Sequence, residues 1–258
     1  MDRLSHSLVT VMPDVKATNE GIEQLVAFQE SSAEPLARIL GVLGRWGDST
    51  GHGSVVDALV TMWSRCGETE PAVAYLRYYP AVLLLWAYGI GLAIAKRWHD
   101  LHSLLSQTVD DGYGNPKRFV YLVSEWFLEG NRNDLWKRLP GLEDHYAPVS
   151  DHLYSVLDDW RNSFAAVLPS FEEVHDTWEI LFSLINYEPA ADERERGGWA
   201  PVGRNGWRHQ FRARLLARIS EGDLCSDLVD AGLAGGARDR LAAYVEQYEN
   251  FVARLRWN

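Results

Sequence analysis

The residues with the clearest chemical potential lie in one short segment, Arg204-Asn205-Gly206-Trp207-Arg208-His209. An imidazole near its unperturbed pKa can give or take a proton at neutral pH. A guanidinium can offset the charge of a phosphate through paired hydrogen bonds. Arg204 and His209 are therefore the candidate catalytic residues, for acid–base chemistry at a phosphate.

The spacing Arg-Asn-x-x-x-His resembles the strict form of the motif that marks HEPN ribonucleases. The resemblance implies that Arg204 and His209 converge on a scissile phosphate, where His moves a proton and Arg stabilises the developing charge. It also implies a homodimer that needs neither metal nor cofactor. Gly206 within the motif, and the Pro-Val-Gly run at 201–203, favour a loop here. The alternative is therefore structural: Arg204 and Trp207 anchor a loop on the core, and His209 stays exposed.

The same region holds the strongest positive patch in the sequence. Five arginines fall within fifteen residues with no acidic residue among them: Arg204, Arg208, Arg212, Arg214 and Arg218. The first three are spaced by four, so we expect them to share a helix face. The cluster predicts a contact surface for RNA, a nucleotide or an acidic protein partner. The alternative is internal pairing with the acidic segment 188–195.

Other candidate sites are less specific. Glu172 and His175 form one Glu-x-x-His, which di-iron bundles use twice, together with two further Glu. His99 and His102 are three residues apart, but the spacing fixes no third zinc ligand. The sequence therefore predicts no metal site and no cofactor.

The elements that position these residues are predicted to be helical. Apolar residues recur at helical spacing nearly everywhere, first at 22–28, then in a helix that follows Pro35, and no run of alternating β-branched residues suggests a strand. This pattern predicts an all-α fold, a bundle of about ten helices. The longest apolar run, Ala81 to Ala95, is shorter than the ~20 residues that a membrane span needs. We interpret it as a buried central helix, and membrane contact is not expected.

The clearest break in the pattern is the turn-rich segment from Asp110 to Pro116. It divides the chain into an N-terminal helical subdomain, residues 1–109, with the central helix, and a C-terminal subdomain, residues 110–258, with the Arg-rich helix. One continuous domain is the alternative.

Composition narrows the class of protein. The chain has 258 residues, 47% of them hydrophobic, and a formal net charge of −11. It is too apolar to be intrinsically disordered, and its overall charge does not suit a general nucleic-acid binder. Two cysteines, Cys66 and Cys225, cannot form a disulfide scaffold. With no secretory pattern at the N-terminus, the sequence predicts a cytoplasmic location.

Three segments, residues 76–85, 178–184 and 201–208, together resemble an uncharacterised helical region of bacterial conflict and anti-phage proteins. The resemblance covers roughly residues 70 to 220. There the region tends to follow an effector or sensor domain, and the matching motifs suggest packing and loop anchoring. The resemblance implies a partner protein or larger effector of the same system.

The leading functional hypothesis is therefore a helical interaction or regulatory module of a bacterial defence system. It would bind a partner protein, nucleotide or nucleic acid through residues Arg204 to Arg218. The alternatives are a metal-independent HEPN-type ribonuclease that acts as a dimer and, third, a membrane-active effector that uses the run from Ala81 to Ala95.

Overall fold

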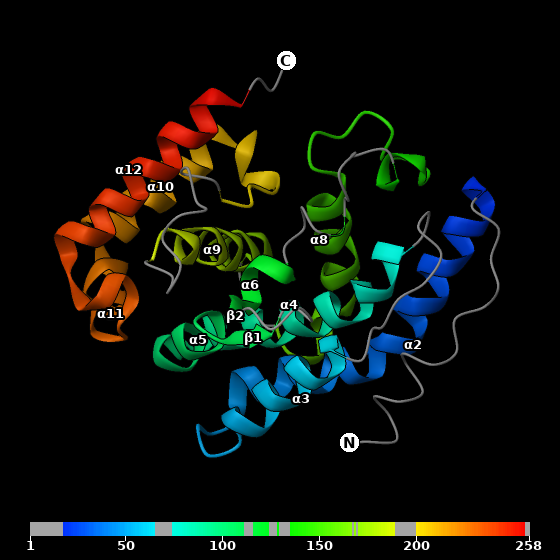
Figure 1. The fold of residues 1–258 in the computed structure, drawn as a ribbon, viewed down its shortest axis with the longest axis horizontal. Helices are drawn as coiled ribbons and strands as arrows, with labels where there is room; N and C mark the ends of the chain where they lie inside the picture. Colours follow the sequence, from blue (N-terminus) through cyan, green and yellow to red (C-terminus); the bar gives the residue numbers. More distant parts are fainter. Residues whose placement is uncertain are drawn as a thin grey trace.

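The computed structural model describes residues 18–64, 74–110, 116–123, 128, 135–166, 168, 170–188 and 200–255 (Figure 1). Nine α-helices of eight residues or more lie in this part of the chain, close to the predicted ten. They are α2 (Asn19–Trp46), α3 (His52–Ser64), α4 (Tyr79–Ile94), α5 (Trp98–Leu105), α8 (Pro148–Trp160), α9 (Phe171–Leu184), α10 (His209–Ser220), α11 (Asp223–Asp230) and α12 (Arg238–Arg254). The all-α prediction is confirmed.

Shorter elements connect these helices. A one-turn helix, α6 (Phe119–Leu122), follows an antiparallel ribbon formed by β1 (Thr108–Asp110) and β2 (Pro116–Arg118). No strand was predicted from the sequence, and this ribbon lies at the predicted break, where three residues on each side pair. The 3-10 turns are η1 (Ala74–Tyr78), η2 (Trp136–Arg138), η3 (Arg161–Ser163), η4 (Ile185–Tyr187), η6 (Arg204–Gly206) and η7 (Leu233–Gly236).

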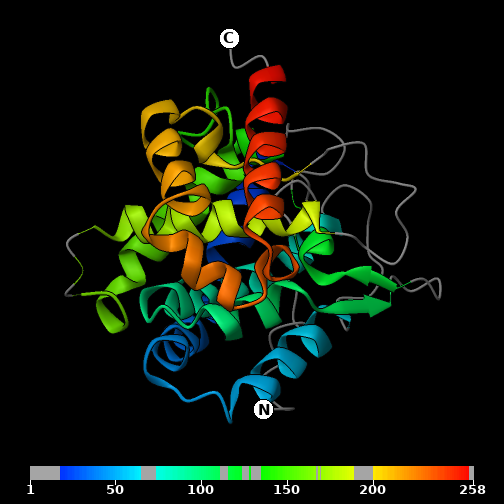
Figure 2. The ribbon, with the colours of Figure 1, turned by 90° about the vertical axis from the view of Figure 1, so that its left-hand side faces the viewer.

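The helices stack in layers around α4 and α9 (Figures 1 and 2). α10, α11 and α12 lie on one side of α9, and α4 packs against its other side, with α2 and α3 beyond α4. The rings of Trp86 on α4 and Trp178 on α9 are nearly perpendicular, with centroids 5.7 Å apart. One buried apolar cluster runs from Ile22 to Val252 and crosses the predicted boundary at residues 109–110.

The central helix is confirmed: every residue of α4 from Tyr79 to Ala93 is buried. By length and composition the segment Tyr75–Ile94 could cross a membrane, but 83% of its most apolar window lies inside the protein. Burial within the bundle therefore accounts for its hydropathy.

Pro35 lies inside the single helix α2, so the prediction of a separate helix after it is wrong. The ring is tolerated because it lies on the exposed side, while the opposite side packs closely along α4. Glycines make that approach possible. A Cβ on Gly44 would clash with the carbonyl oxygen of Tyr88, and one on Gly91 with that of Gly41. Packing along the whole helix thus overrides the local break.

Candidate functional site

Arg204 lies in the 3-10 turn η6, before α10 begins, and its side chain is buried. Its guanidinium Nη2 donates to Glu172 Oε1 at 2.7 Å, and Nε lies 3.7 Å from Asp176 Oδ1. The guanidinium also stacks over the Tyr154 ring, with Cζ 3.8 Å from the ring centroid. This candidate catalytic arginine is therefore held in the interior by two carboxylates of α9 and one aromatic ring.

Asn205 fixes the same turn to α9. Its backbone N–H donates to Glu179 Oε2 at 3.1 Å, and its side-chain Nδ2 donates to the same oxygen at 2.5 Å. The other oxygen of Glu179 accepts from Ser150 Oγ, which in turn accepts from the Arg204 N–H at 2.8 Å. A Cβ on Gly203 would clash with Glu179, so only glycine permits this approach. The segment 203–205 is thus a buried anchor.

His209 lies apart from this anchor. It is the first residue of α10, it is exposed, and its Nδ1 lies 3.1 Å from Arg212 Nη2. No hydrogen bond or ion pair joins Arg204 to His209 in the described part of the chain. The two halves of the Arg-Asn-x-x-x-His pattern therefore lie in different environments. Trp207, which the structural alternative expected to anchor the loop, is 39% exposed, and Asn205 makes the anchoring contacts beside Arg204 instead.

The remaining arginines of the cluster also bind within the protein, except one. Arg208 pairs with Asp176 and, at 3.0 Å, with Glu172, while Arg212 donates to the carbonyl oxygens of Asn205 and Gly206. Because α10 begins at His209, Arg204 and Arg208 precede the helix instead of sharing a face of it with Arg212. Arg214 is exposed and makes no ion pair among the described residues.

The described partners of Arg204 and Arg208 lie on α9. The sequence suggested segment 188–195, of which the structure describes only residue 188. Glu188 instead contacts Arg118 and the backbone N–H of Ala234. Residues 172, 176 and 179 are spaced at i, i+4 and i+7, so three carboxylates share one face of α9. This acidic face was the signal available in the sequence.

His175 lies in the same region without a hydrogen bond. Its side chain is fully buried, and neither ring nitrogen has a hydrogen-bond partner among the described groups, although Nδ1 lies 3.5 Å from Asp176 Oδ1. Burial lowers the pKa of His175 to about 4, so the ring is neutral at physiological pH. Within the described residues no three potential ligands are grouped to hold a metal. Glu172 and His175 therefore have no further metal ligand beside them in this part of the chain.

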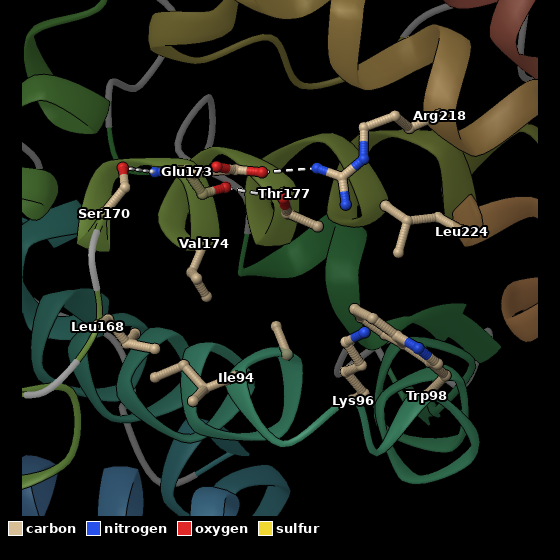
Figure 3. Close-up of a pocket in the computed structure, with 11 residues that line it drawn as sticks. Ile94, Lys96, Trp98, Leu168, Ser170, Glu173, Val174, Thr177, Arg218 and Leu224 are labelled. Carbon is tan, nitrogen blue, oxygen red and sulfur yellow. Dashed lines mark hydrogen bonds and ion pairs between the residues drawn. The ribbon is translucent and has the colours of Figure 1, made fainter. Parts of the chain in front are cut away.

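Arg218 lines a pocket between α4, α9 and α11 (Figure 3). Arg218 Nη1 donates to Glu173 Oε1 at 2.5 Å and Nε donates to Asp223 Oδ1 at 2.9 Å, and both bonds raise its pKa. The cavity volume is about 180 Å³. Its apolar part is formed by Ala93, Ile94, Leu168, Val174 and Leu224, and its polar part by Lys96, Trp98, Ser170, Glu173, Thr177 and Arg218.

Two side chains of this pocket have unused polar groups. Trp98 is 7% exposed, and its indole Nε1–H has no acceptor among the described residues. Lys96 is exposed, makes no ion pair in the described chain and has a φ of +53°, a left-handed conformation that side chains rarely adopt. Figure 3 shows both side chains rising from the end of α4 and the start of α5 toward Arg218 and Leu224. Neither residue belongs to a recognisable motif, although lysine is rare in this chain.

A second hollow, of about 500 Å³, shares Lys96 and Trp98 with the pocket. Its remaining charged lining is mostly acidic, including Asp227 and Asp230. Asp100 lies there too, where burial raises its pKa but hydrogen bonds from Ser49 and Arg97 outweigh this and lower it. The acidic lining makes this side unfavourable for an extended polyanion.

No known protein family matches this chain, and neither a curated protein nor a solved structure was found to be similar to it.

Proposed function

We propose that this chain is a helical binding module, and that its pocket beside Lys96, Trp98 and Arg218 takes a small organic monoanion with an apolar body. The observation that carries the proposal is the buried indole N–H of Trp98, which has no acceptor in the described protein. A buried donor without a partner is costly, so a small shift of the indole that lets a ligand oxygen reach this N–H recovers a hydrogen bond.

Size and charge define the ligand class. A cavity of ~150 Å³ with apolar walls holds a molecule the size of benzene, and this one measures about 180 Å³. Lys96 supplies a positive charge that has no ion-pair partner among the described residues, while Arg218 is already balanced by Glu173 and Asp223. One carboxylate on a single ring or a short branched chain therefore fits. The acidic second hollow disfavours RNA or a nucleoside triphosphate here.

The regulatory setting is part of the proposal. Residues 70–220 resemble a helical region that follows effector or sensor domains. This resemblance supports a role in which ligand binding in the pocket regulates a partner protein. A cytoplasmic place in a bacterial defence system is proposed on the same ground. Of the clustered arginines, Arg218 lines the pocket. Arg204, Arg208 and Arg212 are instead bound within the protein.

The test uses benzoate as the probe, with benzyl alcohol as its neutral analogue. We expect benzoate, and not benzyl alcohol, to shift the indole N–H resonance that disappears in the Trp98→Phe variant. Lys96→Gln should weaken benzoate binding about tenfold, the value of one charge-assisted hydrogen bond, and the control Arg214→Gln should leave it unchanged. Equal binding of benzyl alcohol, or no response at Trp98, would refute the proposal.

The ribonuclease alternative stays a prediction with its own test. Arg204 is bound to Glu172 and Asp176, and no contact joins it to His209 in the described chain, so the geometry offers no specific support for it. RNA cleavage in the presence of a chelator that is lost in His209→Ala would establish it and displace the binding module as the leading function.

A further inference from the structure

The second hollow adjoins the pocket, because Lys96 and Trp98 line both spaces. The hollow has a volume of about 500 Å³, and Asp227 and Asp230 of α11 form part of its wall. Leu224, near the start of the same helix, lies on the wall of the pocket. A ligand held at Lys96 and Trp98 can therefore extend into either space.

The charges in the hollow leave a surplus of carboxylates. Arg97 and Asp100 balance each other, with Arg97 Nη2 2.6 Å from Asp100 Oδ2. Asp227 and Asp230 are exposed, and in the described part of the chain neither side chain has a hydrogen bond or an ion pair. The described lining therefore contributes two unpaired carboxylates against one lysine, Lys96. This surplus favours a cationic group in the hollow.

The position of the two aspartates on α11 strengthens the negative field. Asp227 and Asp230 are three residues apart in the last turn of the helix, so they lie on one side of it. The carboxyl end of a helix carries the negative end of its dipole, and the last turn of α11 has no basic residue. Asp223, at the opposite end of α11, is by contrast paired with Arg218 at 2.9 Å. A cation in the hollow therefore interacts with both carboxylates and with the helix end.

Trp98 indicates independently that a ligand atom belongs at the junction of the two spaces. Its side chain is 7% exposed, and its indole Nε1–H has no acceptor among the described residues. An indole N–H is a donor only, so it binds an oxygen and not a cation. Lys96, which lines both spaces with Trp98, likewise favours a carboxylate. The junction therefore suits an anionic group, and the hollow beyond it suits a cationic one.

We propose that the ligand is an α-amino acid with an apolar side chain. The side chain fills the pocket of about 180 Å³, the carboxylate binds at Lys96 and Trp98, and the ammonium group lies toward Asp227 and Asp230. Both charged groups of an α-amino acid are attached to one carbon, so they reach the junction together while the side chain points the other way. This inference rests on the proposed function, since it names the ligand class of the same pocket.

Calorimetric titration of the full chain with L-phenylalanine and with 3-phenylpropionate, which lacks only the ammonium group, tests the inference. We expect phenylalanine to bind about five- to tenfold more tightly at low salt, because each exposed ion pair contributes a few-fold at most and two carboxylates act together. The double variant Asp227→Asn, Asp230→Asn should abolish this difference and still bind 3-phenylpropionate. The matched control is Asp159→Asn, which changes an exposed aspartate in the last turn of α8 that lines neither space, and it should preserve the difference.

The possible results separate this inference from the proposed function. If benzoate binds and phenylalanine binds no more tightly than 3-phenylpropionate, the inference is overturned and the monoanion pocket stands. A difference that survives in the double variant also overturns it, because the ammonium group then lies elsewhere. If neither benzoate nor the two larger ligands bind, the pocket itself is refuted and the inference fails with it.

Discussion

Asn205 and Glu179 are joined by two hydrogen bonds, from the backbone N–H at 3.1 Å and from side-chain Nδ2 at 2.5 Å, both to Glu179 Oε2. Glu179 is 3% exposed and Asn205 is fully buried. The pair connects α9 to the turn that precedes α10, elements 26 residues apart in sequence. Asn205, the second residue of the Arg-Asn-x-x-x-His pattern, thus fixes the turn before α10 to α9.

Asn205→Ala is expected to lower the free energy of unfolding by about 2–3 kcal/mol, because the buried carboxylate of Glu179 loses one donor. Chemical denaturation measures this change. The control is His209→Ala, which removes an exposed side chain of the same segment and should stay within about 0.5 kcal/mol of the wild type. Equal effects of the two substitutions would contradict the anchoring role.

Arg208 and Arg214 should behave very differently, although both belong to the Arg-rich segment. Arg208→Ala leaves the fully buried Asp176 without its closest partner, and breaking such a pair costs about 3–5 kcal/mol. Arg214→Ala removes an exposed arginine without an ion pair in the described chain, and should change stability by less than about 0.5 kcal/mol. Thermal and urea denaturation of the two variants, side by side, decide this.

Local patterns predicted most of the fold. The uniform apolar run of α4 predicted its burial. The start of α9 is also marked locally, since Ser170 Oγ accepts from the Glu173 N–H at 3.1 Å. The cap is a property of four consecutive residues, so sequence alone contains it. Helix α2 was divided wrongly because the local effect of Pro35 is visible in sequence, whereas the glycine-mediated packing along α4 is not.

The candidate site was predicted only in part, because its contacts are long-range. The sequence drew attention to Arg204 through Arg218, but their partners on α9 lie 32 and 45 residues away, as in Arg208–Asp176 and Arg218–Glu173. Spacing cannot show which acidic segment folds back. Lys96 and Trp98 carry no motif, and they line a pocket only because α9 and α11 pack near the end of α4.

His175 should make the fold sensitive to mild acid. Burial lowers its folded-state pKa to about 4, below the ordinary 6.5, so the unfolded chain binds more protons between these values. Its contribution is complete above pH 6.5 and decreases as the pH falls toward 4, with a loss of about 2 kcal/mol by pH 5. Unfolding free energies at pH 7.5 and pH 5 should differ less in His175→Gln than in the wild type. An unchanged difference would refute this role.

Lys96 should lower the stability of the fold and strengthen the binding of benzoate. Its left-handed φ of +53° costs a side-chain residue about 1–2 kcal/mol, and glycine adopts it freely. Lys96→Gly should therefore raise the free energy of unfolding by about 1 kcal/mol and weaken benzoate binding about tenfold. Ala234, with a φ of +55°, offers a matched control: Ala234→Gly relieves the same backbone conformation outside the pocket and should leave benzoate affinity unchanged. Calorimetric titration and denaturation of both variants separate the two effects. If Lys96→Gly is stabilised and still binds benzoate as tightly as the wild type, the lysine is not part of the site.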